Sequence, residues 1–192
     1  MIETTVAPVI DADLLALVLD HVKVETGDEQ TAYGDLVEAY LEAAIGRIES
    51  ASGRCLFTRT MELTTDAFGT ALIIPVSPVI SVASITYVDL DGVTQTLSSS
   101  TYSLINRLET PAIFPVHGAE FPKARDYPGS ITVTLDAGYG EDVADIPSQL
   151  RMAVMQTVAD WFRFGGNVAT TSVMELPASA RHACMNFRRQ WA

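Results

Sequence analysis

The stretch from Ala137 to Pro147, which reads Ala-Gly-Tyr-Gly-Glu-Asp-Val-Ala-Asp-Ile-Pro, separates a part of the chain patterned for strands from a part patterned for helices. Just before it, residues 131–135 (Ile-Thr-Val-Thr-Leu) are apolar at every second position, which predicts a half-buried strand. Just after it, apolar residues recur at helical spacing from Leu150 to Phe162, which predicts an amphipathic helix. The hydrophobic period therefore changes from 2 to about 3.6 residues across one short loop.

Outward from this stretch, the pattern places helices towards both ends of the chain and short strands in its middle. Helices are expected over residues 11–19, 26–53, 147–164 and 177–189. Strands are expected over residues 60–67, 72–74, 82–89, 93–97, 102–105, 112–114 and 131–135. Leu90-Asp91-Gly92 is expected to form a hairpin turn, and residues 116–129 a long irregular loop.

These elements predict an α+β fold, in which helical N- and C-terminal segments flank a small antiparallel β-sandwich or barrel-like module. We expect a single domain over residues 1–192. Its N-terminal helices occupy residues 1–58, its β module residues 59–136, and its C-terminal helices and tail residues 146–192.

The composition is that of an ordinary globular protein. Of the 192 residues, 48% are apolar and 19% are charged, and a chain of this length buries about 70% of its unfolded surface. No apolar run approaches the roughly 18 residues that cross a bilayer, and the first residues do not resemble a secretory signal, so we expect neither a membrane partner nor secretion. Cys55 and Cys184 have no metal-ligand spacing around them, so we expect two buried, reduced thiols, with a disulfide between them as the alternative.

Charge is distributed unevenly along the chain, whose net charge is −12. Residues 1–60 carry eleven acidic and four basic residues, and residues 61–146 carry eleven and three. Residues 147–192 reverse the balance, with two acidic and five basic residues. An acidic body gains no affinity by neutralising phosphates, so recognition of nucleic acid sequence is not expected as the main activity.

No residue pattern points to a catalytic, cofactor or metal site, and we expect none. His21, His117 and His182 are far apart in sequence and none pairs with an acidic residue at metal-ligand spacing. The acidic residues in 141–145 are explained by the positive end of the helix dipole that follows them. Two alternatives stay open: a small hydrolase that uses residues 141–145, and a ligand- or glycan-binding β-sandwich with exposed aromatic residues such as Tyr87 and Tyr102.

The end of the chain is the strongest local candidate for an interaction surface. Residues 187–191 read Phe-Arg-Arg-Gln-Trp. Aromatic and arginine residues are enriched at the positions that dominate the binding energy of protein interfaces. A frayed tail is the alternative interpretation.

Several stretches, taken in order along the chain, resemble the head–tail connector (adaptor) proteins of long-tailed bacteriophages and phage-like particles. The stretches that carry the resemblance are residues 48–56 leading into 61–64, then 72–79, 85–92, 127–134, 137–140, 146–162 and 175–177. The last helix departs from the family pattern at residues 178–182, where Ala-Ser-Ala-Arg-His replaces a more apolar stretch.

The resemblance implies a structural virion protein of the head–tail joint, with no enzymatic activity and no cofactor. Its implied form is a homo-oligomeric ring of about twelve copies, seated between the portal protein of the capsid and a tail-side neck or stopper protein. DNA would pass through the bore without sequence-specific binding, and assembly would take place in the cytoplasm of the host bacterium. We expect the portal contact to be made by Arg181, Phe187, Arg188, Arg189 and Trp191, and acidic faces to line the channel.

Overall fold

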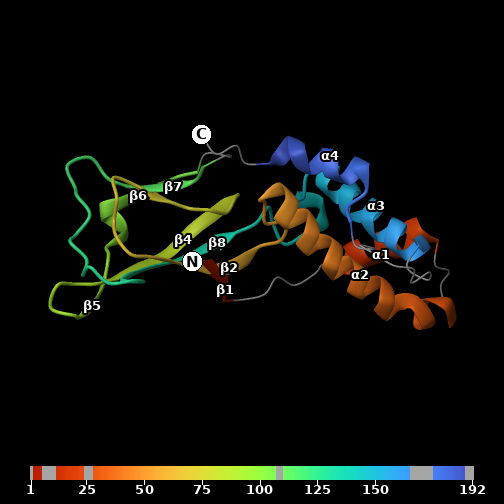
Figure 1. Cartoon of the computed structure of the whole chain (residues 1–192), viewed down its shortest axis with the longest axis horizontal. Coiled ribbons are helices and arrows are strands. Elements are labelled where there is room, and N and C mark those ends of the chain that lie inside the picture. Colours follow the sequence, from red (N-terminus) through yellow and green to blue (C-terminus); the bar gives the residue numbers. More distant parts are fainter. Residues whose placement is uncertain (1, 6–11, 24–27, 107–109, 165–174, 189–192) are drawn as a thin grey trace. The chain divides into compact units, whose positions relative to one another are not determined.

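The computed structural model describes residues 2–5, 12–23, 28–106, 110–164 and 175–188 (Figure 1). The chain divides into two compact units. The β unit comprises residues 1–8 and 58–139, and the helical unit comprises residues 9–57 and 140–192. Within the described residues the chain has four α-helices and two antiparallel sheets, so the mixed α+β class is confirmed.

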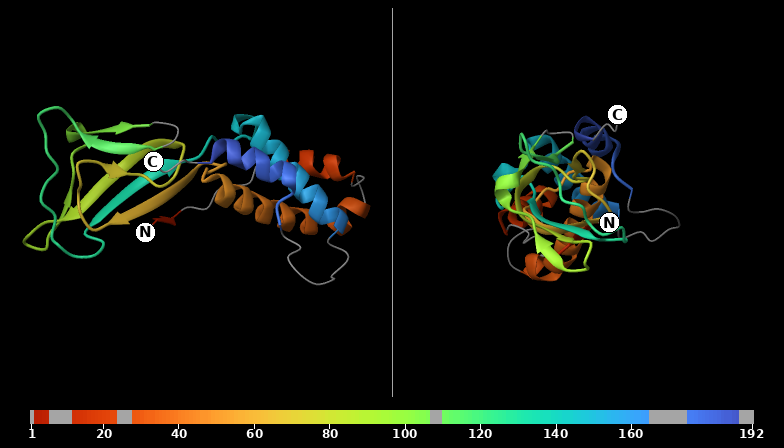
Figure 2. Two further views of the ribbon diagram at one scale, coloured as in Figure 1. Left: turned by 45° about the horizontal axis from the view of Figure 1, so that its top comes forward. Right: turned by 90° about the vertical axis from the view of Figure 1, so that its left-hand side faces the viewer.

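The β unit contains one sheet of five strands and one of three, which do not close into a barrel within the described residues. The five-stranded sheet has the order β1 (Ile2–Thr4), β2 (Arg59–Thr65), β8 (Ile131–Ala137), β4 (Val79–Val88) and β5 (Thr94–Thr96). The three-stranded sheet has the order β3 (Leu72–Ile73), β7 (Ala112–Pro115) and β6 (Tyr102–Ile105). Strands β6 and β7 lie over β4 and β8 in two different views (Figures 1 and 2).

The core of the β unit follows from the alternation that the sequence shows. Every second residue of β8, from Ile131 to Ala137, is fully buried. The strand registers place Leu63 of β2 and Ile85 of β4 on either side of Val133 of β8, so one apolar row crosses three strands. The opposite face of the same sheet is polar, and there Asp136 accepts hydrogen bonds from Thr60 Oγ1 at 2.8 Å and Ser81 Oγ at 2.9 Å.

The predicted hairpin joins β4 to β5. Gly92 has φ +82°, a conformation that favours glycine. The Asp89 carboxylate accepts hydrogen bonds from the backbone N–H groups of Asp91 at 3.0 Å and Val93 at 2.9 Å. Its other oxygen accepts a bond from Gln95 Nε2 at 2.8 Å. The Gln95 bond, followed by the bond from Val93, lowers the pKa of Asp89 because both stabilise the charged carboxylate.

The helical unit consists of α1 (Ala12–Val22), α2 (Asp28–Ser52), α3 (Ser148–Phe164) and α4 (Ala178–Phe187) within the described residues. Helices α2 and α3 pack through fully buried apolar side chains, and α1 and α4 each pack against both of them. Trp161 of α3 is buried, as its helical spacing predicted, and meets Tyr40 of α2 edge to face with ring centroids 6.3 Å apart. Helix α2 ends at Gly53, which has φ +67° and donates its N–H to the Glu49 carbonyl at 2.8 Å.

Several element boundaries differ from the sequence prediction by a few residues, and one strand was missed. Strand β1 was not predicted, because three residues are too few to show an alternating pattern; β2 alone pairs with it. Helix α4 ends at Phe187 rather than Arg189. The predicted starts of the first two helices, at residues 11 and 26, lie outside the described residues.

Candidate interaction surface

Helix α4 is held to the rest of the helical unit along one side. Ala180 and Cys184 on that side are 0% and 1% exposed. The Cys184 thiol lies 4.0 Å from the Ile48 carbonyl of α2, and Ser179 Oγ donates a hydrogen bond to Gln156 Oε1 of α3 at 2.8 Å. The opposite side of α4 therefore faces away from the core of the unit.

The exposed surface beside the buried side of α4 carries two arginines, Arg181 and the C-cap residue Arg188, with a methionine between them. Arg181, Met185 and Arg188 follow one another at spacings of four and three residues, which places them on one face of a helix. We call these three residues the α4 outer face. All three are exposed, and Met185 is 58% exposed.

The two arginines have few partners in the described part of the chain. Arg181 donates to the Leu176 carbonyl at 3.3 Å, and its guanidinium is 3.9 Å from the Glu175 carboxylate, with both side chains more than half exposed. No carboxylate among the described residues pairs with Arg188. Exposed pairs of this kind contribute only about 0 to 1 kcal/mol, so these cations are available to a partner.

The structure separates the residues that the sequence groups as one portal-binding set. Arg181 and Arg188 belong to the α4 outer face. Phe187 is half-buried and lies on the packed side of the helix, one turn after Cys184. Arg189 and Trp191 lie outside the described residues.

A residue that the sequence did not single out fixes the end of α4. Arg54, immediately after the glycine that ends α2, is only 6% exposed, and its Nε donates a hydrogen bond to the Phe187 carbonyl at 2.9 Å. A cation at the C-terminal end of a helix stabilises it by pairing with the unsatisfied carbonyls there. In sequence, Arg54 looks like a surface residue after a helix, and no local signal distinguishes it.

The acidic residues considered for a hydrolase serve a structural purpose at the start of α3. Asp142 and Asp145 form a reciprocal capping box around the short 3₁₀ turn Val143–Asp145, in which Asp142 N donates to Asp145 Oδ2 at 3.4 Å. Glu141, Asp142 and Asp145 are all exposed. Two hollows in the described residues each have a volume of about 590 Å³, one beside Phe68 and Phe121 and one beside His21 and Phe162. None of these three acidic residues lines either hollow.

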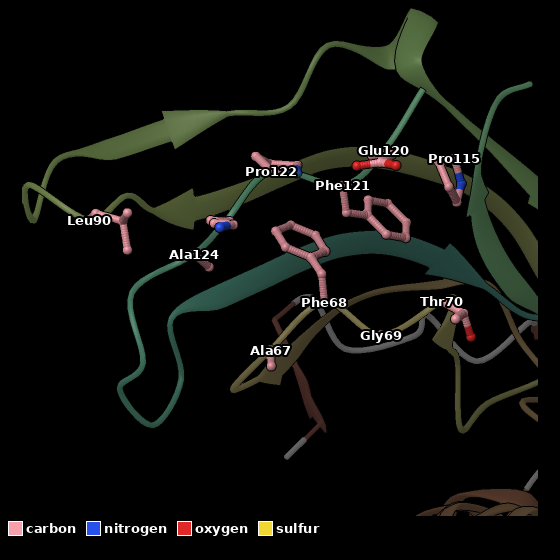
Figure 3. A pocket seen from close by; sticks show the side chains of 11 residues that line it. Ala67, Phe68, Gly69, Thr70, Leu90, Pro115, Glu120, Phe121, Pro122 and Ala124 are labelled. Carbon is pink, nitrogen blue, oxygen red and sulfur yellow. The ribbon is translucent and has the colours of Figure 1, made fainter. Parts of the chain in front are cut away.

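The β unit contains an open groove lined by aromatic residues (Figure 3). It bears on the alternative of a ligand- or glycan-binding β-sandwich, for which Tyr87 and Tyr102 were the candidate residues. Phe68 and Phe121 stack in it with ring centroids 4.8 Å apart, and Tyr87 meets Phe68 edge to face at 5.8 Å. The groove is wide open, and its only charged lining residues are Glu120 and Lys123. Tyr102 lies outside this lining, and its partial burial raises its pKa.

The remaining candidates for chemistry are dispersed. His21, His117 and His182 are all exposed, and the described residues contain no group of three or more His, Cys, Asp or Glu side chains arranged to hold a metal ion. Cys55 and Cys184 are buried and carry no disulfide, and burial raises the pKa of Cys184. Among the described helices, none combines the length and the apolar character needed to cross a membrane.

Comparison with known proteins identifies the fold. No protein family matches the sequence, and no curated protein matches it. Among solved structures, a chain in the virion of a native gene transfer agent particle is similar with a TM-score of 0.82 and 24% identity, and the match covers 100% of this chain and 97% of that one. A chain in the neck of an empty gene transfer agent particle, computed with C6 symmetry, gives a TM-score of 0.76 and 23% identity over 100% and 97% of the two chains.

A chain in the neck of a native gene transfer agent particle, computed with C12 symmetry, gives a TM-score of 0.71 and 21% identity over 98% of this chain and 97% of that one. In all three cases the match extends over both units of the present chain. The resemblance found in the sequence is therefore confirmed at the level of the fold: this chain has the fold of a neck component of a phage-like particle.

Proposed function

We propose that this protein is a structural head–tail adaptor, which forms a ring under the capsid portal, joins head to tail and leaves a channel for DNA. The observation that carries the proposal is the full-length similarity to chains from particle necks solved with sixfold and twelvefold symmetry. A chain in a cyclic assembly needs two different, complementary surfaces, because a head-to-tail contact closes by rotation. We infer that the whole chain acts as one connector domain, with helical segments flanking the β module.

The charge of the chain is consistent with a passive role next to DNA. The chain carries a net charge of −12, with twice as many acidic as basic residues. Acidic faces that line or approach the channel would repel the phosphate backbone and keep DNA from adhering as it moves. The proposal involves no catalytic step. Asp142 and Asp145, two of the acidic residues considered for a hydrolase, form the capping box of the 3₁₀ turn Val143–Asp145.

Imaging of the purified protein by negative-stain electron microscopy, alone and together with the portal protein of the same particle, tests this function. We expect rings seated on the portal, with the subunit number given by the rotational symmetry of the images. Absence of rings both alone and on the portal would refute the adaptor proposal. Enzymatic turnover of a small substrate by a monomer would do the same.

We further propose that the end of the chain contacts the portal, with Phe187, Arg189 and Trp191 as its principal residues. Phe187 is the last residue of α4, and its carbonyl accepts a hydrogen bond from Arg54 Nε at 2.9 Å. Replacing Arg189 and Trp191 by alanine, which leaves Arg188 in place, should abolish portal binding in a pull-down while the circular dichroism spectrum stays unchanged. Unchanged portal binding by this double variant would refute the assignment.

A further inference from the structure

We propose that the α4 outer face of one subunit binds the exposed face of α2 in the next copy, and that this pair of faces joins neighbouring subunits. The inference rests on the proposed ring and specifies its contact. It assigns Arg181 and Arg188 to a neighbouring copy of this chain rather than to the portal.

The exposed face of α2 is the acidic counterpart of the α4 outer face. Asp35, Glu38, Ala39, Glu42 and Gly46 lie within about 100° of one another on the helix, at 100° per residue, opposite the buried residues of α2. We call these five residues the α2 outer face. The only basic residue of α2 is Arg47, at one side of this face, and the three carboxylates form no ion pair within the described part of the chain.

The two faces match in spacing as well as in charge. Asp35 and Glu42 are seven residues apart on α2, and Arg181 and Arg188 are seven residues apart along α4. Seven residues correspond to about 10.5 Å along a helix axis, so both charge pairs can form at once between helices packed side by side. Met185, between the arginines, would then lie over Ala39.

Gly46 is unexplained by the packing of its own chain. A Cβ atom added there would have no neighbour within 4 Å, and its φ is not positive. Glycine inside a helix destabilises it by about 1 kcal/mol relative to alanine. A glycine at the surface of a helix lets the backbone of another molecule approach closely, which suits one end of a contact between copies.

The two faces also suit a rotational assembly. Within the helical unit, α4 packs directly against α2 as well as α3, so the two outer faces belong to neighbouring helices of one subunit. Since the two faces differ, a contact between them is heterologous, and repeating it produces a ring or an open chain rather than an isolated dimer.

Paired charge reversals test the contact. Variant X carries Asp35→Arg and Glu42→Arg, and variant Y carries Arg181→Glu and Arg188→Glu. Each alone brings like charges together at every contact, and we expect its self-association, measured by sedimentation velocity at low salt, to weaken at least about tenfold relative to the wild type. In an equimolar mixture, X and Y alternate with opposite charges at every contact, so association should return.

Two control variants carry the same charge changes on the β unit: Glu62→Arg with Asp126→Arg, and Lys123→Glu with Arg125→Glu. They should associate like the wild type, and circular dichroism should show that all four variants are folded. Wild-type association that is unaffected in X and Y overturns this inference but leaves the ring intact. A mixture of X and Y that fails to associate also overturns it.

Failure of the wild type to associate, even on the portal, refutes the proposed ring itself and this contact with it. Zero-length carbodiimide crosslinking of a variant with Arg181→Lys and Arg188→Lys provides a second measurement. We expect crosslinks between these lysines and Asp35, Glu38 or Glu42 of another copy. Crosslinks from the lysines only to other acidic residues would overturn the contact.

Discussion

Replacing Gly140 with alanine should destabilise the protein through a single neighbour, Asp145. The three atoms nearest to a Cβ placed at Gly140 all belong to the Asp145 side chain, and two of them lie only 2.5 Å away. Gly140 does not have a positive φ, so alanine is not excluded by its backbone conformation. The obstacle is therefore the side chain that completes the capping box with Asp142.

The expected magnitude combines three effects. Forcing extra atoms into an occupied space destabilises by about 1 to 3 kcal/mol. Displacement of Asp145 from its capping position adds about 0.5 to 2 kcal/mol. Against these, replacing glycine by alanine at a compatible φ stabilises by about 0.4 to 1 kcal/mol, because the unfolded chain loses freedom. Together these ranges give a decrease in the free energy of unfolding of about 0.5 to 4.6 kcal/mol for Gly140→Ala alone.

A second substitution changes the sign of the effect. In a background of Asp145→Gly, which removes both the carboxylate and its Cβ, Gly140→Ala should be neutral or stabilise the protein by up to about 1 kcal/mol. Urea unfolding of the wild type, the two single variants and the double variant gives the coupling free energy directly. Equal destabilisation by Gly140→Ala in both backgrounds would show that Asp145 is not the cause, and would refute the reasoning.

Three further perturbations have defined outcomes. Arg54→Met should speed trypsin cleavage after Arg188 and lower the free energy of unfolding by about 1.5 to 3 kcal/mol, because the Phe187 carbonyl loses a charged donor at 2.9 Å. Cleavage at the wild-type rate would show that the hydrogen bond from Arg54 does not hold the end of α4. Val133→Ala should lower the free energy of unfolding, measured in urea, by about 1 to 3 kcal/mol, because it opens a cavity in the apolar row that crosses β2, β8 and β4. The control Thr134→Ala, on the other face of β8, should change the free energy of unfolding by under about 0.5 kcal/mol. The pKa of Asp89 is lowered in the folded state, so its carboxylate stabilises the fold above about pH 4, and this stabilisation is lost as the pH falls through the folded-state pKa. Asp89→Asn should therefore make the free energy of unfolding fall less steeply below about pH 4, and parallel acid-unfolding curves for the two proteins would contradict this.

The strands and helices of this chain are strongly determined by local sequence. The alternation of β8 and the helical spacing of α3 are visible in single short windows, and Gly92 and Gly53 mark a turn and a helix end through their positive φ values. Strand β1 has no such signal, since it is a strand only because β2 offers it a partner.

The candidate surface was found only in part. Sequence identified a basic, aromatic chain end, because arginine and aromatic residues are conspicuous there. It did not reveal that Phe187 lies on the packed side of α4 while Arg181 and Arg188 lie on the exposed side, because that division depends on which side of α4 meets α2 and α3.

By itself, then, the sequence determined the order of elements, the apolar face of each, and a resemblance carried by many short stretches in series, because all of these depend on residues close together in the chain. Tertiary structure decided what each exposed residue can meet. Arg54 reaches Phe187 across 133 positions of sequence, and Asp35, Glu38 and Glu42 form no ion pair with any other described residue. Such contacts depend on chain segments brought together only by folding, and no local pattern encodes them.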